Sequence, residues 1–136
     1  MYFAIKADVP SPNATRFAFD SQKTMYAGNQ ISAGDTIFIF ASENEGGPGL
    51  VAQGIVTCAE AIARTPGIKR QTPRVTLRVR RTALASRRQG RAELKNFSQW
   101  NDDRPQTELN FKFYRQATNK IVGISDAAAA YLLTFF

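Results

Sequence analysis

The sequence has 136 residues, is 43% hydrophobic and carries a formal net charge of +7, with a pI near 10.0. This length is that of one globular domain, and the positive charge favours an anionic partner. The absence of histidine excludes histidine-based catalysis, and a single cysteine excludes an internal disulfide or a cysteine-rich zinc site. We therefore expect one domain, residues 1–136, without a metal ion or another cofactor.

The N-terminal half of the sequence contains three candidate strands. Residues 2–6 alternate and predict a first strand, whereas residues 14–30 follow no single period and predict a loop with at most a short helical turn. Residues 36–42 and 50–57 are rich in β-branched and aromatic side chains and flank the glycine-rich stretch 43–49, which predicts a β-hairpin. The run 36–40 is apolar on both faces, so at least one face covers a core and the other is free to line a pocket.

The C-terminal half adds two candidate strands and a helix. Residues 74–81 show the clearest period of two, with an arginine-bearing outer face, and residues 109–114 alternate in the same way. Residues 83–96 fit a connecting loop or a short helix. Ser125 and Asp126 provide an N-cap and an acidic first turn for a helix that reaches Phe136.

These elements predict an α+β fold class, a small mixed β-barrel of about five to six strands with peripheral helices and a C-terminal helix. Helices do not alternate with the strands, so a parallel α/β fold is not expected. No apolar run approaches the roughly 18 residues of a membrane span, and Met1–Lys6 does not resemble a signal peptide. We expect a cytoplasmic protein with no membrane partner; the oligomeric state stays open.

Few residues point to catalysis. Asp102, Asp103, Glu43 and Glu45 lie in polar stretches, where solvated loop charge is the simplest interpretation and a carboxylate site is the alternative. The lone Cys58 is expected to be a small buried residue. We therefore expect a protein that is not an enzyme.

Binding residues are better represented than catalytic ones. Arginines gather on the strand 74–81 and directly after it, where their guanidinium groups could contact phosphates or could only solvate an edge strand. Aromatic residues of the strands could stack on bases or could belong to the core. The polar run 115–120 follows Tyr114 and offers amide and guanidinium groups that can recognise a base edge, or it is an ordinary loop before the C-terminal helix.

Several segments together resemble the EVE domain of the PUA-like superfamily, with the ASCH and YTH domains as near relatives. They are the N-terminal strand 2–6, the Gly34-Asp35 turn and following strand with Ser42 just beyond it, the returning strand at 54–56, and the basic strand 75–81. The resemblance implies a pseudo-barrel of about six strands with a pocket beside it, in a family that binds RNA or DNA with modified bases. By position it places Phe40 and Ser42 at the pocket end of the hairpin strand and Lys6 at the end of the first strand.

The leading hypothesis is a non-catalytic nucleic-acid-binding module for RNA or modified-base DNA. Its base pocket would use Lys6, Phe40, Ser42, Tyr114, Arg115, Gln116 and Asn119. Its phosphate contacts would use Arg78, Arg80, Arg81, Arg87, Arg88 and Lys120. The alternative is a protein-interaction or small-ligand-binding domain, and a third possibility is an enzyme acting on nucleotides, for which Asp102, Asp103 and Glu43 would have to converge.

Overall fold

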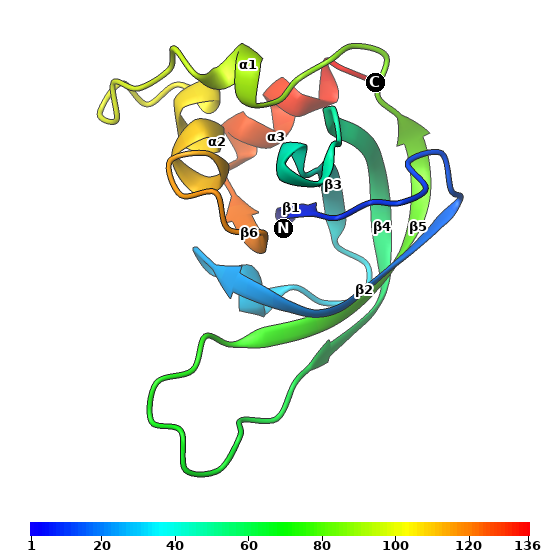
Figure 1. Ribbon diagram of the computed structural model, residues 1–136. Coiled ribbons are helices and arrows are strands. Elements are labelled where there is room, and N and C mark those ends of the chain that lie inside the picture. The colour runs from blue at the N-terminus through cyan, green and yellow to red at the C-terminus, as the bar shows by residue number, and fades with distance from the viewer.

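The computed structural model describes all 136 residues and shows six strands closed into a barrel with three α-helices grouped on one side (Figure 1). The order around the barrel is β1-β3-β4-β5-β2-β6, in which β1/β3 and β2/β6 are parallel and the other pairs antiparallel. The strands are β1 (Tyr2–Ala7), β2 (Arg16–Met25), β3 (Thr36–Ala41), β4 (Gly49–Ala61), β5 (Arg74–Leu84) and β6 (Lys120–Ile124). The helices are α1 (Arg91–Leu94), α2 (Pro105–Phe113) and α3 (Asp126–Leu133), with 3-10 turns η1 (Gly28–Gln30) and η2 (Glu43–Glu45). The α+β class and the small mixed barrel are confirmed.

Two apolar cores lie on opposite faces of the strands β1, β3 and β6. One fills the barrel and takes alternate residues such as Ile5 and Ile39, and the other lies under the helices and takes Phe38 and Phe40. Because strand side chains point to alternate faces, both faces of residues 36–40 are buried. The second face of this strand therefore packs against helices rather than lining a pocket.

The most regular sequence patterns gave the correct elements. The first strand, the hairpin of β3 and β4, and the basic strand β5 are all present. The C-terminal helix α3 begins where expected, since the Ser125 hydroxyl accepts a hydrogen bond of 3.0 Å from the Ala128 amide. None of the helices is long and apolar enough to cross a membrane.

The strand predicted over residues 109–114 is wrong, because this segment belongs to helix α2. Pro105 occupies the first turn, where its missing N–H needs no partner, and it starts the helix. Leu109 and Phe113 are four residues apart and both fully buried, so they share one helical face. The alternation seen in the sequence coincides with this helical spacing and does not distinguish the two.

The loop predicted over residues 14–30 is also wrong, because it contains the strand β2. Phe17 and Phe19 point into the barrel, but the pairing with β5 shifts register between Phe19 and Gln22. Ser21 lies in this bulge with a φ of 50°, so the alternation is interrupted halfway along the strand. The bulge removed the period that would have revealed the strand, and the short strand β6 was missed as well.

Truncation of Phe40 should destabilise the protein strongly. Its ring is fully buried and lies 5.1 Å, centroid to centroid, from Phe113. Phe40→Ala leaves a cavity between β3 and α2 and should lower the free energy of unfolding by about 3–5 kcal/mol, whereas Phe40→Leu should cost less. Urea unfolding of the three proteins measures this, and equal stability of Phe40→Ala and the wild type would contradict the packing described here.

Candidate functional site

Polar side chains gather where β1 and β3 end and β6 begins, on the helix side of the sheet. Lys6 pairs in register with Phe40 of β3 and with Lys120 of β6. Ser42 follows β3 two residues after Phe40. Alternation therefore carries Lys6, Ser42 and Lys120 to the same side as the helix-covered core, at its edge.

The two lysines are buried and bind backbone carbonyls. Lys6 is 0% and Lys120 1% exposed, and neither forms a salt bridge. The Lys6 ammonium donates to the Phe113 carbonyl at 2.8 Å, and the Lys120 ammonium donates to the carbonyls of Gln116 (3.2 Å) and Thr118 (2.9 Å). Burial lowers the pKa of both lysines, to about 8 for Lys120, whose pKa is depressed further by the neighbouring Lys6 charge.

A second set of contacts closes the site from the side of η2. Tyr114 donates its hydroxyl to both carboxylate oxygens of Glu43, at 3.0 and 3.1 Å, and the Arg91 amide donates to the same carboxylate at 2.6 Å. The Lys6 ammonium lies 4.9 Å from the centre of the Tyr114 ring. Burial, reinforced by the Glu43 carboxylate, raises the pKa of Tyr114, which keeps its hydroxyl a donor. Gly90 lets the Glu43 carboxylate approach the backbone, because a Cβ at this position would lie 2.5 Å from a Glu43 oxygen and would displace that side chain.

Two buried oxygens at this site have no hydrogen-bond partner. They are Ser42 Oγ and Asn119 Oδ1. The Ser42 backbone is fully used, since its amide donates to Ala7 and its carbonyl accepts from Gly47, so only the hydroxyl is unpaired. Buried acceptors without a partner are rare and cost stability, and they indicate a place where a ligand or a water completes the bonding.

Asn119 lines a cleft of about 310 Å³, which we call the Asn119 cleft. It lies between the β2 bulge, η2 and the segment that leads into β6. The lining residues are Ser21, Gln22, Lys23, Asn44, Glu45, Arg74, Ala117, Thr118 and Asn119. All of these residues except Ala117 are polar, and Lys23 and Arg74 contribute two positive charges against the one negative charge of Glu45, which suits a polar ligand.

The residues predicted for the base pocket fall into different environments. Phe40 is fully buried against Phe113, so the prediction that its ring stacks on a base is not supported by its position. Tyr114 is half-buried beneath Glu43, and the Arg115 guanidinium lies 4.1 Å from the centre of the Phe111 ring. Gln116 is exposed and outside the cleft lining. Lys6 and Ser42 lie buried close by, and of the seven predicted residues only Asn119 lines the cleft.

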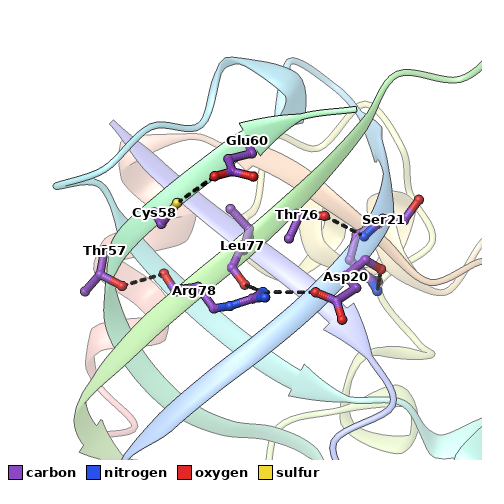
Figure 2. A network of polar contacts seen from close by, with 9 residues as sticks. Asp20, Ser21, Thr57, Cys58, Glu60, Thr76, Leu77 and Arg78 are labelled. Carbon is purple, nitrogen blue, oxygen red and sulfur yellow. Dashed lines mark hydrogen bonds and ion pairs between the residues drawn. The ribbon is translucent and has the colours of Figure 1, made fainter. Parts of the chain in front are cut away.

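The residues predicted for phosphate contact do not form one surface. Figure 2 shows Arg78 on the outer face of β5 in an ion pair of 3.0 Å with Asp20, while Arg80 is exposed without a side-chain partner. Arg81 and Arg87 donate to backbone carbonyls of Asn13 and Thr134, and Arg88 lies 3.5 Å from Glu93. Lys120 is buried, so it was wrongly placed at a phosphate-binding surface.

The carboxylates considered for catalysis bind different parts of the chain. Asp102 accepts from the Arg104 amide at 3.0 Å before α2, whereas Glu43 binds Arg91 and Tyr114. Cys58 is half-buried rather than buried, with its thiol 3.7 Å from a Glu60 carboxylate oxygen on the outer face of β4 (Figure 2). These groups do not share one site in the structure.

The sequence analysis predicted only Asn119 of the nine residues that line the cleft, and three of those it missed have side chains suited to ligand binding. Lys23 lies on the strand that the β2 bulge concealed, and Asn44 lies in the stretch interpreted as a flexible hairpin tip. Arg74 was assigned to the basic strand but not to a pocket. For Arg74 the sequence did contain a signal of anion binding, because the surrounding residues 61–92 include no aspartate or glutamate that could neutralise its charge.

The fold defined by this barrel and helical layer is that of the EVE and DUF55 domains, as the sequence resemblance implied. The structure superposes on the DUF55 domain of human thymocyte nuclear protein 1 with a TM-score of 0.66 and 14% identity, over 98% of this chain and 97% of that one. No protein-family model and no curated protein matches the sequence.

Two further solved structures have the same fold. Human THYN1 in complex with DNA containing 5-methylcytosine matches with a TM-score of 0.66 and 16% identity, over 98% of this chain and 95% of that one. A hypothetical protein from Leishmania major matches with a TM-score of 0.62 and 19% identity, over 98% and 92% of the two chains. At these identities the likeness establishes the fold.

The buried charge of Lys120 should make stability depend on pH in a defined window. Between its pKa of about 8 and the ordinary lysine value of 10.5, the unfolded chain binds more protons than the native protein, so stability rises with pH. The unfolding free energy of the wild type minus that of Lys120→Met should therefore increase by roughly 2 kcal/mol between about pH 7 and pH 10.

Urea unfolding at the two pH values measures this difference. Lys95→Met, which removes an exposed lysine, is the control and should show no comparable change. A difference between wild type and Lys120→Met that is flat with pH would show that the Lys120 ammonium is hydrated in the native protein.

Proposed function

We propose that this chain is a non-catalytic nucleic-acid-binding module that takes one base into the Asn119 cleft. The first candidate ligand is 5-methylcytosine in DNA. The observation that carries the proposal is the buried, unpartnered Oδ1 of Asn119, a residue that lines a polar cleft. The same fold is seen in human THYN1 in complex with DNA containing 5-methylcytosine. RNA is the second candidate ligand.

The chemistry of the cleft fits a base that carries an exocyclic amino group. Asn119 Oδ1 is an acceptor, and the amino groups of cytosine and adenine are the donors that such an oxygen recognises. A volume of about 310 Å³ lies at the lower end of the range for small-ligand sites, so it suits one base rather than a larger ligand. A base in a duplex would have to be flipped out to reach it, as in other proteins that contact a single base on all its edges.

The positive charge of the protein supports the same partner. A net charge of +7 attracts polyanions and raises the rate of encounter. The walls of the cleft contribute Lys23 and Arg74 against one carboxylate, Glu45, so a base inserted there would bring its phosphates close to a net positive charge.

One observation favours the alternative of a protein-interaction or small-ligand domain. A separate cleft of about 460 Å³ lies beside α2 and contains Trp100 and Phe111. The Trp100 side chain is 44% exposed, and an exposed large apolar side chain is typical of a surface that binds a partner. This cleft is more apolar than the Asn119 cleft, so it suits an apolar side chain of a partner better than a base.

Removal of the Asn119 amide should weaken nucleic-acid binding without unfolding the protein. Asn119→Ala deletes an oxygen that has no intramolecular partner, so stability should stay close to that of the wild type. The affinity for a DNA duplex with one central 5-methylcytosine should fall about tenfold, the expected loss for one good base contact. Fluorescence anisotropy at low and moderate salt measures this, with unmodified DNA and RNA of the same sequence as comparisons.

The matched control is Asn101→Ala, which removes an exposed asparagine that does not line the Asn119 cleft. Equal affinities of Asn119→Ala and wild type would exclude the Asn119 cleft as the base site. Failure of the wild-type protein to retain any of the nucleic acids at low salt would favour the alternative function, and Trp100→Ala would then be the variant to test in partner binding.

A further inference from the structure

The loop that joins β4 to β5, residues 62–73, projects from the barrel on the side away from the helices (Figure 1). We call it the β4–β5 arm. It lies in a segment, residues 61–92, that holds ten of the eighteen lysines and arginines of the protein and no acidic residue. The arm therefore carries positive charge without carboxylates of its own to neutralise it.

A second cleft, of about 640 Å³, lies between the arm and the bulge of β2; we call it the arm cleft. Four basic residues line it, namely Lys23, Arg64, Arg70 and Arg74. Ser21, Lys23 and Arg74 line both this cleft and the Asn119 cleft. The two clefts therefore meet, and one extended ligand could occupy both.

Hydrogen bonds inside the arm give it a fixed shape. The Gln71 side chain accepts from the Thr65 amide at 2.8 Å and donates to the Thr65 carbonyl at 2.7 Å. The Arg74 guanidinium donates to the Ser21 carbonyl at 2.6 Å and ties the base of the arm to β2. By contrast, the exposed side chains of Lys23 and Arg70 form no hydrogen bond or ion pair within the protein.

We propose that the arm cleft binds the sugar-phosphate backbone next to the base held in the Asn119 cleft. The proposal rests on the proposed function and specifies which surface holds the phosphates. The Lys23 ammonium on β2 and the Arg70 guanidinium on the arm are exposed and unpaired, so each loses little on binding a phosphate and releases counterions of the nucleic acid. Continuity between the two clefts lets one strand reach both.

The outer face of β5, expected from the sequence to contact phosphates, is less suited to this role. Arg78 already pairs with Asp20, and the neighbouring strand β4 adds the carboxylate of Glu60, as Figure 2 shows. These carboxylates would repel a phosphate that approached Arg78. Neither Arg78 nor Arg80 lines the Asn119 cleft.

Two variants, each lacking two positive charges, test the assignment. The arm variant is Lys23→Gln with Arg70→Gln, and the matched control is Arg78→Gln with Arg80→Gln. Binding of a DNA duplex with one 5-methylcytosine is measured by anisotropy at several salt concentrations. The arm variant should bind about tenfold more weakly at moderate salt, and the slope of log affinity against log salt should become shallower by about 1.8, the value for two lost phosphate contacts. The control variant should keep the slope of the wild type.

Three results would overturn the assignment. An arm variant with the affinity and slope of the wild type would exclude the arm cleft while leaving the base site intact. Equal losses in both variants would show a general effect of net charge. A wild-type protein that binds neither DNA nor RNA would refute the proposed function together with this inference, so the two failures are distinguishable.

Discussion

The burial of two lysine side chains at adjoining strand ends determines the geometry of the candidate site. An ammonium group removed from water needs acceptors, and neither Lys6 nor Lys120 has a carboxylate bound to it. The chain between α2 and β6 supplies backbone oxygens instead. The acceptors are the carbonyls of Phe113, Gln116 and Thr118. These bonds hold residues 114–119 over the strand ends, and that segment in turn places Asn119 in the wall of its cleft.

The location of the site follows from a sheet that is covered on both faces. Apolar side chains of β1 and β3 point alternately into the barrel and towards the helices, so neither face is open to a ligand. Polar side chains of these strands can therefore be reached by a ligand only at the strand ends. Ser42, one residue past β3, is the first position on the helix side where a polar side chain replaces a phenylalanine. The aromatic faces stabilise the fold, and the strand ends carry the chemistry.

The charge of the protein is distributed unevenly among its surfaces. Arginines on the outer face of β5 and near the C-terminus are largely engaged, with Asp20, Glu93 or backbone carbonyls. The β4–β5 arm contains no acidic residue, and the exposed Arg70 side chain on it has no partner within the protein. Net charge alone does not distinguish these surfaces, because it counts paired and unpaired cations equally. The partners of each guanidinium group decide which surface is free to bind an anion.

Four of the six barrel strands and the C-terminal helix could be predicted from the sequence, because β1, β3 and β4 are rich in apolar, β-branched and aromatic residues, β5 has a clear period of two, and α3 has its serine cap. The sequence could not determine β2, where the bulge at Ser21 interrupts the period, nor α2, whose alternation equally fits a helical face. The sequence also pointed to Lys6, Ser42 and Asn119 as site residues. The structure was needed to show that Lys6 is buried and bound to a carbonyl 107 residues away in sequence. It was also needed to show that the side-chain oxygens of Ser42 and Asn119 have no hydrogen-bond partner. Periodicity is a local property of the chain, whereas desolvation and hydrogen bonding depend on which distant segments meet, and only the folded structure decides that.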